Sequence, residues 1–296
     1  MNLIFNGLSL SSIILLASLG LAITFGLMRV INMAHGEFMM IGAYTAYVVQ
    51  RLVSQIFTNS GADIGYFVSI IIAFAVTFII GSLLETFVVS RLYGREIDSL
   101  LATWGISLIL QQAARTIFGT QGVLVKTPSV LSGSIKIGGA SLSMTRLFII
   151  VLVVCLLGVW ALMYHTNYGR QMRAVMQNRA MAQCMGINSR KIDNITFSIG
   201  SGLAGIAGCS IALLGSIDST VGQNYIVNTF MAVVLGGVGK LLGTVLGSSI
   251  IGFSSIGFET ITSSSIAKAI VLLIIIVFLQ KKPQGLFTVR SRALDE

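Results

Sequence analysis

The 296-residue chain is 55% hydrophobic and only 10% charged, and its mean hydropathy is +0.91. About a quarter of the residues are charged in ordinary soluble domains, so this composition excludes a soluble domain and, more firmly, intrinsic disorder. The excess of 19 Lys and Arg over 10 Asp and Glu would suggest nucleic-acid binding in a soluble protein, but in a membrane protein it is typical of cytoplasmic loops. We therefore expect an integral membrane protein that contacts lipid and no nucleic acid.

Long runs without charge predict the membrane-embedded helices. A hydrocarbon core of about 30 Å needs about 20 helical residues. The runs that meet this length without a charge are 1–28, 64–84, 147–169 and 194–217. Weaker candidates lie at about 35–56, 98–118, 225–239, 241–258 and 266–280. We expect an all-α, polytopic transmembrane bundle with eight or nine embedded segments, forming a single transmembrane domain over 1–296. The first run lacks the basic start of a signal peptide and is expected to remain as a helix.

Clusters of Lys and Arg predict the orientation. Residues 165–194 carry five basic side chains against the single acid Asp193, and a second basic cluster lies at Lys281, Lys282, Arg290 and Arg292. Both clusters are typical of cytoplasmic segments, which places the N-terminus in the periplasm and the C-terminus in the cytoplasm. For both clusters to lie in the cytoplasm, an even number of membrane crossings must separate them. The stretch 225–258 must therefore form two passes or a re-entrant hairpin.

Within the basic segment, residues 170–185 have a helical pattern. Met172, Val175, Met176 and Ala182 share one apolar face, which Arg179 interrupts. A helix lying on a membrane needs an unbroken apolar face, whereas a helix that docks into a protein groove can place an Arg against an acidic partner. A solvated basic loop is the alternative that composition leaves open.

The Gly-rich stretch 234–241 resembles a phosphate-binding loop only superficially. Val234 and Leu241 occupy the places where that loop needs Gly and Ser or Thr. We expect no cofactor in this chain, and no metal site, because its Cys and His residues do not stand at ligand spacing. Glycines that repeat every four residues predict close helix packing instead; they are Gly239, Gly243 and Gly247.

The segment 30–44, Val-Ile-Asn-Met-Ala-His-Gly-Glu-Phe-Met-Met-Ile-Gly-Ala-Tyr, resembles the signature of the branched-chain amino acid class of ABC transporter permeases. Further similar strings follow in order at 102–110, 173–182, 233–239 and 280–287. Within this class, Gln-Asn-Arg-Ala-Met-Ala and Lys-Pro-Gln-Gly-Leu-Phe look most like the urea-transporter permease subunit. Permeases for branched-chain amino acids or short amides share most of these strings.

The resemblance implies a transport protein without enzymatic activity in the bacterial inner (plasma) membrane. Its partners would be a second, related permease in a heterodimer, two cytoplasmic ABC ATPases that bind the ATP, and a periplasmic substrate-binding protein. Segment 165–194 would be the cytoplasmic coupling segment, and the loop 121–142 would bear on the binding protein. The candidate coupling residues are Arg170, Arg173, Gln177, Asn178, Arg179, Met185, Gly186 and Ile187.

A pathway for urea needs neutral polar groups, because urea has one carbonyl acceptor and four N–H donors. The candidate pathway residues are Asn32, Glu37, Thr103, Trp104, Gln111, Asn228 and Thr229. The polar residues from Asn32 to Glu37 interrupt the apolar sequence, as expected where unwound backbone lines a cavity. An acid that complements a helix dipole is an equal alternative for Glu37, and for the other residues the alternative is a hydrogen bond to a neighbouring helix.

Two other classes of transport protein remain open. A passive small-solute channel would also explain the neutral polar residues, but it has no need of a basic cytoplasmic helix. A secondary transporter would need an ion site, for which the available acids are Glu37, Glu85 and Glu259. Both classes predict transport by this chain alone.

Overall fold

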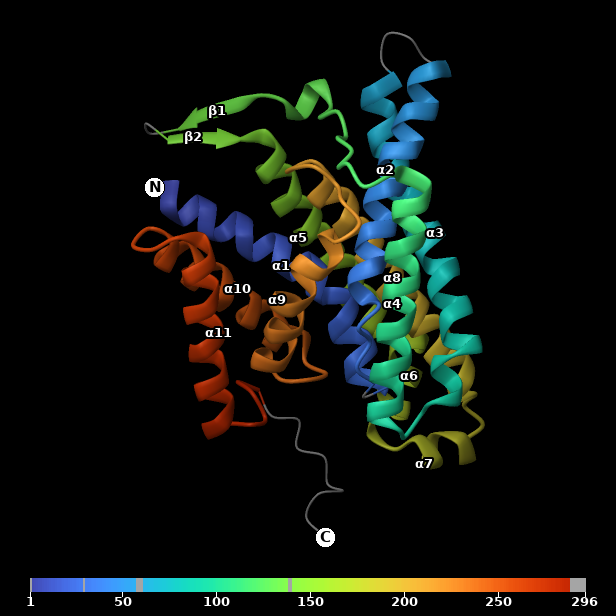
Figure 1. Cartoon of the computed structure of the whole chain (residues 1–296). Helices are drawn as coiled ribbons and strands as arrows, with labels where there is room; N and C mark the ends of the chain where they lie inside the picture. The colour runs from blue at the N-terminus through green and yellow to red at the C-terminus, as the bar shows by residue number, and fades with distance from the viewer. Residues whose placement is uncertain (1, 29, 57–60, 138–139, 288–296) are drawn as a thin grey trace.

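The computed structural model describes residues 2–28, 30–56, 61–137 and 140–287 (Figure 1). The basic residues Arg290 and Arg292 lie outside the described residues. The helices are α1 (Asn2–Met28), α2 (His35–Ile56), α3 (Gly61–Phe87), α4 (Glu96–Phe118), α5 (Met144–His165), α6 (Asn167–Gln177), α7 (Arg179–Cys184), α8 (Ser189–Ala212), α9 (Val221–Gly236), α10 (Leu241–Glu259) and α11 (Ser264–Lys281). Strands β1 (Ser134–Ile137) and β2 (Ala140–Ser143) form an antiparallel hairpin in which Ile135 pairs with Leu142.

The chain is a helical bundle with the length and hydropathy of a multi-pass membrane protein. Helices α1, α3, α5, α8, α10 and α11 are long and apolar enough to cross a membrane. Helices α2 and α4 have 22 and 23 residues with more polar sequences, and α9, with 16 residues, is only about 24 Å long. The predicted all-α bundle is therefore confirmed, whereas the number of crossings stays a prediction. The short hairpin was not predicted.

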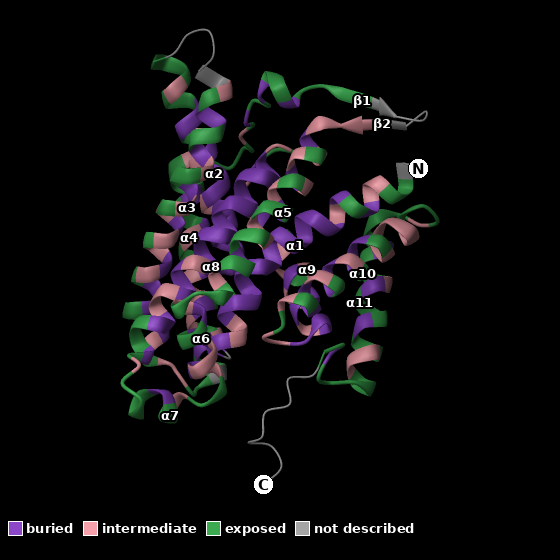
Figure 2. Cartoon of the chain, turned by 180° about the vertical axis from the view of Figure 1, so that it is seen from behind, coloured by how far each residue is buried: buried purple, intermediate pink, exposed green. Residues whose placement is uncertain are grey.

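Helix α8 forms the centre of the bundle, and α1, α2 and α3 pack around it. Every residue from 200 to 212 is buried, as the buried interior in Figure 2 illustrates. Glycines allow this packing, because a Cβ added at Gly42 would lie 2.1 Å from the carbonyl oxygen of Gly205, and one added at Gly208 would lie 1.9 Å from that of Met39. The core therefore depends on backbone contact between helices.

Glycines also join α9 to α10 as a helical hairpin. A Cβ at Gly243 would lie 2.1 Å from the Gly236 carbonyl oxygen, and one at Gly247 would lie 2.4 Å from that of Ala232. The prediction that Gly239 shares this helix face is wrong. Gly239 precedes α10 and has a φ of +84°, because the tight turn between α9 and α10 needs the left-handed backbone that glycine adopts readily.

The two ends of the bundle differ. The β-hairpin and the start of α1 lie at one end, and α6, α7 and the end of α11 lie at the opposite end (Figure 1). At the hairpin end, the connection between α4 and α5 is fastened to the bundle. The Gln50 side chain accepts a hydrogen bond from the Lys126 N–H (2.8 Å) and donates one to the Lys126 carbonyl (2.7 Å), and the Asp63 carboxylate accepts from the Ser129 N–H (2.8 Å). Residues 119–133 of this connection are thus an ordered cap.

Candidate functional site

The break between α1 and α2 is held by side chains. The Asn32 Oδ1 accepts a hydrogen bond from the Ala34 N–H (3.0 Å), which is an Asx turn that leads into α2. Thr103 on α4 accepts a hydrogen bond from the Met33 N–H (3.2 Å) through its hydroxyl. The sequence candidates Asn32 and Thr103 therefore lie beside the same unwound segment, and Glu37 follows in the first turn of α2.

Helix α4 presents a buried polar stripe to this break. The stripe consists of residues four apart on one helix face, Ser99, Thr103, Ser107 and Gln111. The Oε1 of Glu37 accepts hydrogen bonds from the Ser107 hydroxyl (2.9 Å) and the Gln111 Nε2 (2.8 Å), and Gln111 Nε2 also lies 3.1 Å from Ser107 Oγ. The structure thus brings Glu37 and Gln111 together. Sequence analysis missed Ser107, although the four-residue spacing was the signal for it.

Other candidate pathway residues lie outside this cluster. Trp104 is 50% exposed on the outer surface of α4. Asn228 is half-buried on α9, and the buried Thr229 donates its hydroxyl hydrogen bond to the Tyr225 carbonyl of the same helix (2.7 Å). The start of α9 does reach the site, because a Cβ at Gly36 would lie 2.7 Å from the Gly222 carbonyl oxygen.

Three buried polar atoms at the start of α2 have no hydrogen-bond partner among the described residues. They are Asn32 Nδ2, His35 Nδ1 and Glu37 Oε2. His35 points toward α1, where its Nε2 lies 3.0 Å from the Ala17 carbonyl oxygen, whereas Glu37 points toward α4. Unpaired buried polar groups are costly, and three of the five found among the described residues gather in this one region.

The segment at the opposite end of the bundle is divided into two helices. The prediction of one helix over 170–185 is wrong, because Asn178 adopts an extended conformation between α6 and α7. Its side chain caps α7 by accepting a hydrogen bond from the Met181 N–H (3.0 Å). Most of the predicted apolar face is nevertheless buried, since Met172, Val175 and Ala182 are each at most 5% exposed and Met176 is half-buried.

Arg179 contacts groups within the chain. Its guanidinium pairs with the fully buried Asp193 carboxylate of α8 and lies 4.7 Å from the centre of the Tyr93 ring. Tyr93 donates to Glu85 Oε1 (2.8 Å), and the Asn194 amide donates to Glu85 Oε2 (2.8 Å). Burial and the Glu85 carboxylate raise the pKa of Tyr93 well above its usual range, so the phenol keeps the proton that it donates. These contacts, which sequence analysis did not predict, join α7 to α3 and α8.

Most of the remaining candidate coupling residues are exposed, whereas Arg173 and Ile187 are half-buried. Arg170 pairs with Asn167 at the start of α6, and Arg173 donates to the Tyr164 carbonyl (2.5 Å) while lying over the Tyr164 ring. Gln177 and Asn178 are exposed. After α7, Gly186 has a φ of +80° and Ile187 donates its N–H to the Ala182 carbonyl (3.0 Å), which closes the helix. Met181 on α7 is 62% exposed, and Met185, directly after the end of α7, is 77% exposed.

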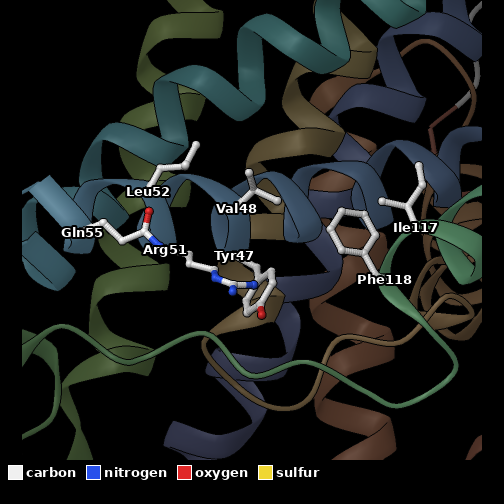
Figure 3. A pocket seen from close by; sticks show the side chains of 7 residues that line it. All are labelled: Tyr47, Val48, Arg51, Leu52, Gln55, Ile117 and Phe118. Carbon is white, nitrogen blue, oxygen red and sulfur yellow. The ribbon is translucent and has the colours of Figure 1, made fainter.

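An open depression of about 410 Å³ lies between the ends of α2 and α4, near the ordered cap (Figure 3). Its lining residues are Tyr47, Val48, Arg51, Leu52, Gln55, Ile117 and Phe118. It begins ten residues beyond Glu37, about 15 Å along α2. The depression includes no candidate pathway residue, so we assign the site to the break before α2.

The chain matches the family described as branched-chain amino acid transport system / permease component over residues 3–279. It belongs to this family, which is a permease class of ABC transporters. It is 27% identical over 292 residues to the high-affinity branched-chain amino acid transport system permease protein LivH of Escherichia coli, covering 95% of this chain and 93% of the relative. It is 28% identical to the permease protein BraD of Pseudomonas aeruginosa, covering 82% of this chain and 80% of that relative. No solved structure is significantly similar to it.

Proposed function

We propose that this chain is a permease subunit of an ATP-driven importer in the bacterial inner membrane, and that urea is its substrate. The family match over residues 3–279 carries the importer assignment. Urea is supported by the resemblance of residues 177–182 and 282–287 to urea permease subunits and by the hydroxyl and amide groups around Glu37. Branched-chain amino acids, named for the relatives, are the second candidate, and short amides share the required N–H chemistry.

The distribution of charge supports an orientation with α6 and α7 in the cytoplasm. Basic residues gather at the α7 end of the bundle, as is usual for cytoplasmic segments. The described Lys and Arg residues at this end lie at the ends of α3, α9 and α11 and in the segment from α6 to α8. They are Arg91, Arg95, Arg170, Arg173, Arg179, Arg190, Lys191, Lys240, Lys281 and Lys282. The start of α1 and the ordered cap then face the periplasm, where the cap is available to a binding protein.

We place the ATPase contact on α7 and the turn that follows it. The exposed Met181 and Met185 offer flexible apolar side chains, which suit insertion into a protein groove. Arg179 then anchors α7 to α8 from the opposite side, because its guanidinium is engaged by Asp193 and Tyr93. ATP is bound by two partner ATPases in this proposal, and movement of α7 reaches α3 and α8 through these contacts.

A second permease completes the proposed transporter as a heterodimer. Helices α5 and α11 bury only 17% of their most apolar 18 residues within this chain, whereas α8 buries 89%. The outer faces of α5 and α11 are therefore available to lipid or to a related permease.

Uptake of labelled solutes tests the proposal. Cells that lack only this chain are compared with cells that express it again from a plasmid, using urea, leucine and acetamide, each with and without ATP depletion. We expect loss of energy-dependent urea uptake with leucine uptake spared. Loss of leucine or acetamide uptake alone would identify that solute as the substrate and would keep the assignment to the ABC class. Uptake through this chain that persists after ATP depletion would favour a channel or an ion-coupled carrier.

A further inference from the structure

Glu37 differs from the other buried carboxylates of the helices in its partners. Asp193 also has an unpaired oxygen, Oδ1, but its charge is balanced by a cation, Arg179, bound at Oδ2. Glu85 has both oxygens hydrogen-bonded, one by Tyr93 and the other by Asn194. Glu37 is only 1% exposed, forms no ion pair among the described residues, and has an unpaired Oε2. A buried carboxylate in this condition is costly unless a further donor reaches it.

The donors around Glu37 converge on one of its two oxygens. Ser107 and Gln111 both donate to Oε1, and they also contact each other, at 3.1 Å. This arrangement fixes the carboxylate and leaves Oε2 free to accept. The first turn of α2 adds a favourable dipole for the negative charge.

The interrupted segment that leads into α2 contains a second unpaired group. Asn32, five residues before Glu37, is 3% exposed and has an unpaired Nδ2 donor. The N-terminal ends of α2 and α9 meet beside the break, where Gly36 and Gly222 touch through their backbones. A free acceptor and a free donor near paired helix starts suit a solute that carries both N–H and carbonyl groups.

We propose that Glu37 Oε2 accepts a hydrogen bond from an N–H group of the transported solute. This inference rests on the proposed function and names the chemistry of its substrate: an amide N–H, as in urea or acetamide, or the ammonium group of an amino acid. Ser107 and Gln111 are positioning residues, because they orient the carboxylate through Oε1. Both of them lie on α4, which therefore holds Glu37 from the side of that helix.

The test uses the complete transporter in proteoliposomes, with saturating loaded binding protein, and measures solute imported per ATP hydrolysed. Glu37→Gln keeps the shape and the hydrogen bonds to Ser107 and Gln111 while removing the charge. For urea or acetamide we expect the ratio to fall about tenfold, and for leucine about a hundredfold, because hydrogen bonds to charged acceptors are the strongest and an ammonium also loses its counter-charge. Glu259→Gln, at an exposed carboxylate, is the matched control and should leave the ratio unchanged.

A structural role for Glu37 would lower the amount of assembled transporter and leave the ratio intact. An assembled Glu37→Gln transporter with the wild-type ratio for every transported solute overturns the proposal. If that variant does not assemble, Glu37→Asp is used instead, because it keeps the charge but shortens the side chain and moves the carboxylate oxygens back. A lower ratio in this variant supports the proposal, and an unchanged ratio rejects it. A wild-type transporter that moves none of the three solutes rejects the proposed function itself, and the Glu37 proposal falls with it.

Discussion

Asp193, fully buried on α8, binds the guanidinium of Arg179 at the first residue of α7. The two residues are 14 positions apart, and the bond closes the segment of α7 and its following turn against α8. The guanidinium also covers the Tyr93 ring, so a single side chain joins three parts of the chain.

Removal of this bond should destabilise the chain. Arg179→Ala leaves Asp193 as an uncompensated buried charge, and we expect a loss of about 2 kcal/mol, discounted for the partial exposure of Arg179. Thermal unfolding of the purified complex in detergent measures the loss. The double variant Arg179→Ala with Asp193→Asn should recover part of it. Arg170→Ala, on the exposed surface of α6, is the control, with an expected change within about 0.5 kcal/mol. Equal melting temperatures for Arg179→Ala and wild type would contradict a structural role for the pair.

The two exposed methionines should affect partner binding without affecting the fold. Met181→Glu with Met185→Glu adds charges to side chains that already face away from the bundle. We expect loss of ATPase co-purification, by at least about tenfold if each buried methionine contributes on the order of 1 kcal/mol. Gln284→Glu, exposed beyond the end of α11, should retain the ATPases. If the double variant retained the ATPases fully, the ATPase contact would lie elsewhere than on α7 and its following turn.

The backbone contact at Gly208 should tolerate no side chain. The Cβ of Gly208→Ala would lie 1.9 Å from the Met39 carbonyl oxygen, so α2 and α8 must move apart. Overpacking of this kind costs about 1–3 kcal/mol. Gly158→Ala on α5 is the matched control, because nothing lies within 4 Å of its added Cβ. Membrane yield and size-exclusion profiles compare the two variants, and similar yields would argue against close α2–α8 contact.

The ordered cap should loosen when Gln50 is shortened. Gln50→Ala removes two hydrogen bonds to the Lys126 backbone, each worth about 1 kcal/mol. We expect faster amide exchange across 119–133, measured by hydrogen–deuterium exchange with mass spectrometry. Gln55→Ala, exposed on the same helix, should leave the exchange rates of that segment unchanged. Equal protection of the cap in both variants would show that other contacts hold it.

Composition and charge-free runs predict the helical bundle because helix length and hydropathy are local properties of the sequence. The contacts of the candidate residues are not local. From the sequence, Arg179 resembles a surface residue, because its contact with Asp193 of α8 exists only in the folded chain. Likewise, Ser107 resembles any helical serine until Glu37 is seen to lie opposite. The structure gathers Glu37, Thr103 and Gln111 near one break, and their role in the pathway stays a prediction.

The enclosure of α8 has a consequence for biosynthesis. Helices α1, α2 and α3 leave the ribosome before α8, and each carries a glycine that lies against α8 in the folded chain. During synthesis of the first five helices, the backbone faces around Gly20, Gly42 and Gly81 therefore stay without their permanent neighbour. Final assembly waits for a helix that begins at Ser189, so the core of the N-terminal half is completed only when most of the chain has been made.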